Sequence, residues 1–183
     1  MTFCDNHDMN RYFTQLNEDK NLYKMGIAMI LTTRGIPQYF YGTEIGFTSP
    51  KERNDGKIRA DMLGGWASDA ASVFQNKNLN ALQQELFDFN KNILNWRKTC
   101  TAIHNGKLTH FAPENGIYSY FRYNEKEKYW IVFNKNSNEV TMDLTRYKEI
   151  LPTKASFTDV LENKKFDTNL SIPARGFRIL KVN

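Results

Sequence analysis

Four polar residues near the N-terminus have side chains that can do chemistry. Asp5, Asn6, His7 and Asp8 follow directly on the apolar pair Phe3-Cys4, a pattern that predicts a short strand running into a polar loop. A carboxylate next to an imidazole can hydrogen-bond the hydroxyl groups of a ligand. The same residues can instead cap the loop through an Asx turn beside a satisfied histidine. Taken alone, the pair His7-Asp8 favours the second interpretation.

A second group of candidate residues lies in a long polar segment, residues 43–78. Arg59 and Asp61 either form an ion pair that holds this segment or contact a substrate. Trp66 either stacks on a ligand or anchors the loop by its own burial. Long loops in compact domains are usually functional or disordered, so the segment is itself a candidate site.

The elements around the first group follow an α/β pattern. Residues 19–33 are apolar on nearly all sides after Met25, which predicts a deeply packed helix that Gly35 and Pro37 end. Residues 36–41 form a short apolar and aromatic run, typical of a strand buried on both faces of a parallel sheet. Helix and strand joined by a tight turn are an α/β signature.

The pattern changes near residue 100. Residues 79–96 carry apolar side chains at alternating spacings of three and four, which predicts a helix of about 20 residues. Beyond Cys100 the chain has only short strand candidates, which predict an antiparallel β-sandwich. These candidates are a hairpin of 117–121 with 129–133, and segments near 140–144, 155–160 and 177–182. We therefore expect two domains, 1–100 and 101–183.

The first domain carries too few strands for a parallel sheet. It offers about two, whereas a parallel sheet needs several strands and cover on both faces. A complete (β/α)8 barrel takes about 250 residues. Residues 1–100 are therefore expected to be part of a larger domain, with apolar surface that promotes association.

Several segments together resemble the α-amylase family of glycoside hydrolases (family 13), over essentially the whole chain. Residues 3–8, followed by Arg11, are similar to the family segment at the end of the seventh barrel strand. Residues 35–44 resemble the family's eighth barrel strand and the loop that follows it. The predicted sandwich resembles the family's C-terminal domain. The stretch 55–66 is similar to the neopullulanase and cyclomaltodextrinase subgroup. The resemblance implies the C-terminal part of a (β/α)8 TIM barrel, strands 7–8 with their helices, followed by an antiparallel β-sandwich.

The resemblance also implies roles for individual residues. Asp8 matches the third active-site acid, which stabilises the transition state, and His7 matches a histidine that binds the same sugar. Arg59, Asp61 and Trp66 become candidate substrate contacts beyond that sugar. Arg11 is expected to orient the loop, and Glu44 to be structural. The implied substrate is an α-glucan: starch, maltodextrin, cyclodextrin or pullulan.

The chain departs from the family where catalysis is concerned. The nucleophile and the acid/base belong to motifs of the fourth and fifth strands, and no stretch of this sequence replaces them. We therefore expect the chain to contribute part of a retaining hydrolase, to be inactive alone, and to have the missing N-terminal part of the barrel as a partner. The alternative is a non-catalytic carbohydrate-binding or structural module, in which tyrosines 118, 120, 123 and 129 either stack on glucan or form the two faces of a packed sheet.

Composition excludes several other classes. The chain has 183 residues with 25 basic and 20 acidic side chains, and the net charge of +5 is spread thinly, unlike that of a nucleic-acid binder. We expect no membrane span, no signal peptide at the start of this sequence and two unpaired cysteines. No cofactor is expected, since His104 and His110 lack partners at metal-ligand spacing. Calcium is common in the family, but its usual ligand region is not among these residues.

Overall fold

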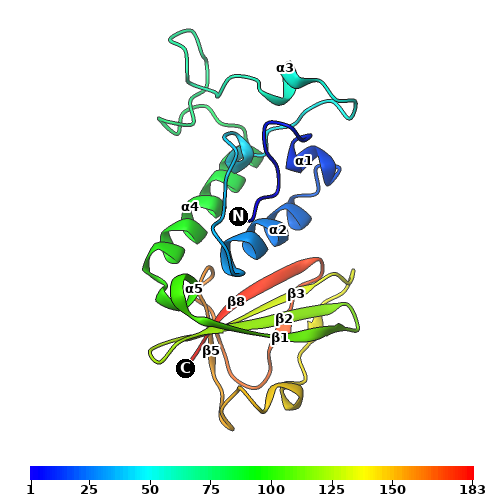
Figure 1. Ribbon diagram of the computed structural model, residues 1–183, viewed down its shortest axis with the longest axis vertical. Helices are drawn as coiled ribbons and strands as arrows, with labels where there is room; N and C mark the ends of the chain where they lie inside the picture. Colours follow the sequence, from blue (N-terminus) through cyan, green and yellow to red (C-terminus); the bar gives the residue numbers. More distant parts are fainter. The chain divides into compact units, whose positions relative to one another are not determined.

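The computed structural model describes all residues, 1–183, and the chain divides into two compact units. The helical unit comprises residues 1–30 and 35–94, and the sheet unit comprises residues 31–34 and 95–183. We describe each unit separately (Figure 1). The helices that lie wholly or mostly in the helical unit are α1 (Tyr12–Gln15), α2 (Lys20–Thr32), the 3-10 helix η1 (Thr43–Ile45), α3 (Asp55–Ile58) and α4 (Ala81–Thr99).

The two long helices form where the apolar periodicity predicts them, and side chains define their first turns. Asp19 Oδ1 accepts hydrogen bonds from the backbone N–H groups of Asn21 (2.9 Å) and Leu22 (3.1 Å), which caps α2. Asn80 and Gln83 bond each other's backbone N–H groups at 2.9 and 3.0 Å, a reciprocal cap at the start of α4. Both predicted helices are confirmed.

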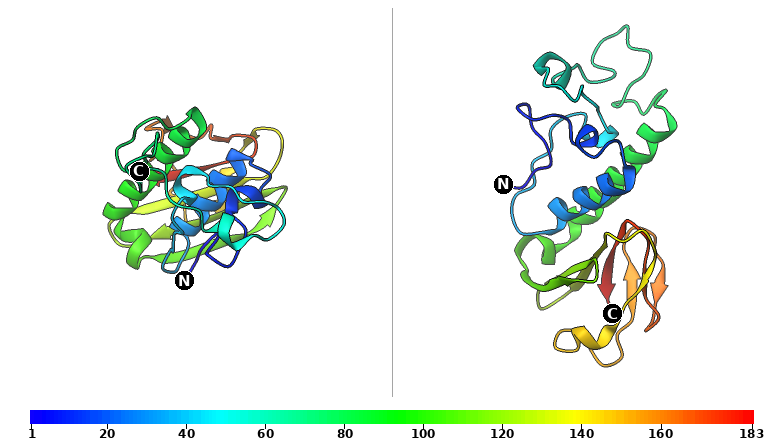
Figure 2. Two further views of the ribbon diagram at one scale, coloured as in Figure 1. Left: turned by 90° about the horizontal axis from the view of Figure 1, so that it is seen from above. Right: turned by 90° about the vertical axis from the view of Figure 1, so that its right-hand side faces the viewer.

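Packing of α2 against α4 creates the core of the helical unit. Tyr23 and Ile27 of α2 and Leu86 of α4 are fully buried, and the right-hand view of Figure 2 shows the two helices side by side. Asn90 of α4 lies in the same core, where its amide donates to the Tyr23 hydroxyl (2.8 Å) and to the carbonyls of Glu44 (3.1 Å) and Leu86 (2.8 Å). Glu85 completes the packing at the surface by pairing with Lys20 at 2.8 Å and Lys24 at 2.7 Å.

The two strands predicted near residues 3–4 and 36–41 are reduced to one parallel bridge between Thr2 and Pro37. The Thr2 N–H donates to the carbonyl of Ile36 (3.0 Å), and the Gln38 N–H donates to the carbonyl of Thr2 (2.8 Å). The burial expected of a central strand is also absent, because Ile36 is 73% exposed. A parallel pair is stable only with neighbouring strands and cover on both faces, so two segments alone do not extend into a sheet.

The sheet unit is built from antiparallel strands and few helices. Its six-stranded sheet has the order β1-β2-β3-β8-β5-β6, of which Figure 1 labels β1, β2, β3, β5 and β8. A two-stranded sheet pairs β4 with β7. The elements of this unit are α5 (Thr101–Asn105), β1 (Lys107–Glu114), β2 (Ile117–Tyr123), β3 (Lys128–Asn134), β4 (Val140–Thr141), the 3-10 helix η2 (Leu144–Tyr147), β5 (Phe157–Asp159), β6 (Lys165–Phe166), β7 (Ser171–Ile172) and β8 (Gly176–Val182). The predicted hairpin, β2 with β3, is confirmed with Ile117 opposite Asn134.

Aromatic side chains dominate the core of the sheet unit. Trp130 of β3 is fully buried and stacks on Phe121 of β2, with ring centroids 5.4 Å apart and planes 4° from parallel. Tyr147 of η2 lies 4.6 Å from the Trp130 ring, and Ile172 of β7 joins the same cluster. The core therefore joins the six-stranded sheet to η2 and to the β4–β7 pair.

The opposite side of β2 carries a buried arginine. The Arg122 guanidinium donates to the carbonyls of Thr32 and Thr33 at 2.8 Å each, and to those of Ile103 at 2.6 Å and Gly106 at 3.4 Å. These carbonyls belong to the C-terminal ends of α2 and α5, where the helix dipole favours a cation. Arg122 thus satisfies two helix ends at once while only 1% of it is exposed.

Both cysteines are free, as predicted. None of the helices is long and apolar enough to cross a membrane. The division of the chain into domains at residue 100 stays a prediction.

Candidate functional site

The loop that carries His7 and Asp8 is closed by the side chain of Asn6. Asn6 Oδ1 accepts from the Asp8 N–H at 2.8 Å, so Asn6 forms the Asx turn. The Asp8 carboxylate and the His7 imidazole are left outside the turn, with side chains 59% and 63% exposed. They lie within reach of each other, with 3.2 Å between His7 Nε2 and Asp8 Oδ2. An Asx turn therefore does close the loop, but through Asn6 and not through the Asp8 carboxylate.

Arginine side chains from the long loop hold this pair. Arg59 Nε donates to the carbonyl of His7 (3.1 Å), and its Nη2 donates to Asp8 Oδ1 (3.3 Å) and to Asp55 Oδ2 (3.1 Å). Arg53 Nε pairs with Asp55 Oδ1 at 2.8 Å, and its Nη2 lies 3.9 Å from Asp8 Oδ1. We call these five residues, His7, Asp8, Arg53, Asp55 and Arg59, the Asp8 cluster.

The short helix α3 places Arg59 in this cluster. The Asn54 side chain caps α3 by accepting from the Lys57 N–H at 3.0 Å, and Ile58 anchors the turn by complete burial. Arg59 follows as the last capping residue, four positions after Asp55, the spacing at which helical side chains meet. Arg53 and Asp55 were not predicted as site residues. The i,i+4 spacing of Asp55 and Arg59 was a signal for Asp55, whereas Arg53 joins the cluster through Asp55.

The other two predicted site residues form a separate pair. Trp66 Nε1 donates to Asp61 Oδ2 at 3.0 Å, and no hydrogen bond or ion pair joins either residue to the Asp8 cluster. Trp66 is 64% exposed, so its interpretation as a buried loop anchor is wrong. The alternative Arg59–Asp61 ion pair does not form either, because Arg59 binds Asp8 and Asp55 instead.

Buried polar groups hold the start of the loop that carries Asp8. Asp5 is 2% exposed and accepts from the Tyr12 N–H (2.9 Å) and the Thr43 hydroxyl (2.8 Å). Burial raises the pKa of the Asp5 carboxyl. Arg11 is fully buried, with its guanidinium 4.1 Å above the Phe40 ring and one N–H on the Tyr41 carbonyl. These contacts join residues 5–12 to residues 40–43 and fix where the Asp8 loop starts.

Neither the site nor the rest of the chain gathers metal ligands. No group of three or more His, Cys, Asp or Glu side chains is placed to hold a metal ion. His110 instead lies against the Tyr118 ring, with centroids 6.4 Å apart.

Two of the four tyrosines considered for glucan stacking are not exposed. Tyr120 is 1% exposed and its hydroxyl hydrogen-bonds Thr32 Oγ1 at 2.6 Å. Tyr129 is 6% exposed and its hydroxyl donates to Glu127 Oε2 at 3.0 Å. Helix ends cover these positions, which the alternating pattern of β2 and β3 does not reveal. Of the four tyrosines, only Tyr118 and Tyr123 retain partial exposure.

Comparison with known proteins identifies relatives over most of the chain. Residues 108–181 match the family described as the cyclo-malto-dextrinase C-terminal domain. The cyclomaltodextrin glucanotransferase of Niallia circulans is 30% identical over 161 residues, covering 88% of this chain and 20% of the enzyme. The α-amylase of the same organism is 27% identical over 176 residues, covering 96% of this chain and 29% of the enzyme. The chain thus spans about a fifth to a quarter of the curated relatives that it matches first.

Solved structures agree on the fold. The α-amylase of Geobacillus thermoleovorans, complexed with acarbose, superposes with a TM-score of 0.71 at 19% identity, covering 99% of this chain and 38% of the other. AmyP in complex with maltose gives 0.74 at 16% identity, covering 98% and 40%. Since the domain match, the sequence relatives and the fold agree, the chain belongs to the α-amylase family of glycoside hydrolases and corresponds to only part of such an enzyme.

Proposed function

We propose that this chain is part of a retaining α-glucan hydrolase, in which Asp8 stabilises the transition state and His7 binds the same sugar. The names of the relatives, glucanotransferases and amylases, support a substrate of the starch or cyclodextrin class. Within the family we propose the neopullulanase and cyclomaltodextrinase type. Arg59, Asp61 and Trp66 are then contacts to sugars beyond the reacting one.

The observation that carries the proposal is the position of Asp8 relative to the parallel bridge. Thr2 and Pro37 are paired in parallel, so Asp8 and Thr43 follow the carboxyl ends of two neighbouring segments. In (β/α)8 barrels the active site lies at the carboxyl ends of the strands. We propose that residues 1–100 contribute the last two strand positions and helices of such a barrel, and that 101–183 form the β-sandwich that follows.

The charges around Asp8 support inactivity of the chain by itself. Besides the third acid that Asp8 matches, a retaining glycosidase needs a nucleophilic carboxylate and a protonated carboxyl group about 5–5.5 Å apart. The carboxylate that shares Arg59 with Asp8 is Asp55, and Arg53 holds the pKa of Asp55 below its ordinary value. Asp55 therefore stays ionised and cannot be the acid, so we assign nucleophile and acid/base to the remaining part of the barrel.

The test combines the chain with the barrel segment that carries the missing strands. The chain alone is expected to leave maltotriose, starch, pullulan and cyclodextrins intact. In the complete enzyme, Asp8→Asn should lower kcat by about 100-fold or more with little change in KM, because hydrogen bonds to the 2-hydroxyl that strengthen in the transition state supply several kcal/mol.

A matched control separates this loss from a general charge effect. Asp88→Asn removes an exposed carboxylate of α4 whose partner is Gln84, and it should leave kcat unchanged. An Asp8→Asn enzyme with the same kcat as the parent, or hydrolysis of maltotriose by the chain alone, would refute the proposal.

The second candidate function is a non-catalytic carbohydrate-binding module. The partial exposure of Tyr118 and Tyr123 on β2 favours it, since exposed aromatic rings stack on sugars. Retardation of the chain in amylose gels that is lost on substitution of these tyrosines would support binding. Unchanged mobility in amylose would leave the sheet unit with a structural role.

A further inference from the structure

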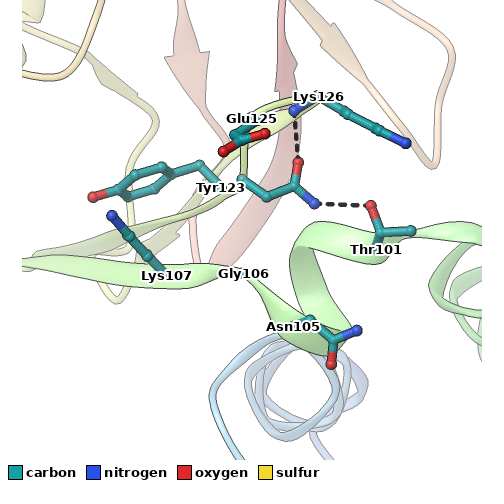
Figure 3. A pocket seen from close by; sticks show the side chains of 8 residues that line it. Thr101, Asn105, Gly106, Lys107, Tyr123, Glu125 and Lys126 are labelled. Carbon is teal, nitrogen blue, oxygen red and sulfur yellow. Dashed lines mark hydrogen bonds between the residues drawn. The ribbon is translucent and has the colours of Figure 1, made fainter.

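The sheet unit contains a cavity of about 550 Å³ that no residue of the Asp8 cluster lines (Figure 3). Both ends of α5, the first residue of β1, the last residue of β2 and the turn between β2 and β3 form its walls. Its volume falls within the range of about 300–1,000 Å³ that small-molecule sites occupy.

Hydrogen bonds hold the walls in place without a ligand. The Asn124 side chain accepts from the N–H groups of Lys126 (2.9 Å) and Glu127 (3.0 Å), and it donates to Thr101 Oγ1 (2.9 Å). The Glu127 carboxylate in turn accepts from the Thr101 hydroxyl (2.8 Å) and the Ala102 N–H (2.7 Å) at the start of α5. These hydrogen bonds join the turn between β2 and β3 to the start of α5, so the cavity is pre-formed.

The cavity has one aromatic wall and several polar side chains without a hydrogen-bond or ion-pair partner in the chain. Tyr123 is half-buried, and a 3.2 Å hydrogen bond between its hydroxyl and Thr109 Oγ1 fixes its ring. The side chains of Asn105, Lys107, Glu125 and Lys126 form no hydrogen bond or ion pair within the chain. Figure 3 shows Lys107, Tyr123 and Glu125 at one end of the cavity, with Thr101 and Asn105 at the other.

We propose that this cavity binds a short stretch of linear α-glucan as a second, non-catalytic site. An aromatic face suits the C–H face of a sugar ring, while free ammonium, carboxylate and amide groups suit its hydroxyls, which both donate and accept. Glu125 offsets the charge of one of the two lysines, and acceptors beside ammonium donors match a hydroxyl-rich ligand, whose groups both donate and accept. The choice of an α-glucan rests on the function proposed above.

The role of such a site is to raise the local concentration of a long substrate. A polymer held at one site meets a second site of the same molecule at an effective concentration set by the intervening chain. The expected effect is therefore on binding and degradation of long glucans, with short oligosaccharides unaffected.

The test is an NMR titration of the ¹⁵N-labelled 183-residue chain with maltoheptaose. Saturable shifts are expected at the amides of Asn105, Lys107, Glu125 and Lys126. The double variant Glu125→Ala/Lys126→Ala should weaken binding about fivefold or more, because it removes two groups that hydrogen-bond hydroxyls. Both side chains are exposed and unpaired, so the variant is expected to fold. Lys135→Ala, an exposed lysine outside the cavity, should bind like the parent.

Three results would overturn the inference. These are the absence of saturable shifts at the cavity, equal binding of cellohexaose, or displacement of maltoheptaose by inorganic phosphate, which would make the cavity an anion site. Binding here together with an inactive complete enzyme would refute only the proposed hydrolase function. An active complete enzyme with no maltoheptaose shifts at the cavity would refute only the second site.

Discussion

Replacement of Arg122 by methionine should destabilise the sheet unit strongly. The substitution keeps most of the side-chain volume but leaves four carbonyl oxygens, at the ends of α2 and α5, without their donor. Each buried carbonyl left unpaired costs about 1–3 kcal/mol. Relief of the desolvation of the guanidinium, itself several kcal/mol, offsets part of that cost. Burial of this cation is also why the pKa of Arg122 is lowered.

The expected net loss is about 3–5 kcal/mol, similar to removal of one partner from a buried ion pair. Arg122→Lys should lose about 2–3 kcal/mol, because a single ammonium cannot reach both helix ends and leaves one or two carbonyls unpaired. Arg146→Met is the matched control: its guanidinium pairs with the exposed Glu114 at 2.9 Å and donates to the carbonyl of the exposed Ala112 at 2.6 Å. Water can replace both contacts, so a loss of about 0–1 kcal/mol is expected.

The measurement is urea denaturation followed by tryptophan fluorescence in a Trp66→Phe background. Trp130 and Trp96, which both belong to the sheet unit, then report its unfolding. A loss below about 1 kcal/mol for Arg122→Met would show that water or rearranged backbone satisfies these carbonyls, and would refute the reasoning.

Three further substitutions test the helical unit. Two lysines of α2 lower the pKa of Glu85 by hydrogen bonding, so its ionised form stabilises the fold above its ordinary pKa of 4.5. Glu85→Gln should cost up to about 1 kcal/mol at pH 7, a difference that disappears in urea titrations as the pH falls to about 3. Asn90→Ala should cost about 2–4 kcal/mol, since it leaves buried partners unsatisfied, and unchanged thermal stability would contradict this. Gly42→Ala should destabilise by about 1 kcal/mol or more, because φ is +83° and the new methyl group would meet the Phe47 ring, so an unchanged melting temperature would argue against that strain.

The parts of the fold that sequence predicts well are those with local causes. The two long helices combine apolar periodicity with caps at Asp19 and Asn80, and the β2–β3 hairpin has two strong strands with a polar turn. Strand β1 was missed because most of its side chains are exposed and it contains Pro113, so only its pairing with β2 makes it a strand. The strand at 36–41 was predicted from an apolar run, but the neighbouring strands that would support it do not form.

The residues of the candidate site were also predicted only in part. His7, Asp8 and Arg59 were predicted as site residues from the resemblance to family segments, and the structure brings them together. Asp55 and Arg53 were missed although Asp55 has its partners Arg53 and Arg59 within four residues, because only the approach of Asp8 from a distant segment makes these charges part of one cluster. Arg122 lies on the side of β2 opposite Phe121, where helix ends bury it, and no pattern within the strand predicts such cover.

The bridge between Thr2 and Pro37 has a consequence for which polypeptides can join it. The polar backbone atoms of Thr2 face residues 36 and 38, so those of Pro37 point to the outer side of the ribbon. Proline has no N–H, and that side therefore offers a carbonyl but no donor at this position. An incoming strand must be in a register that tolerates the missing donor. The missing donor therefore disfavours pairing with strands of other chains, and hence aggregation, on the outer side of Pro37. A strand whose register tolerates the missing donor can still pair there.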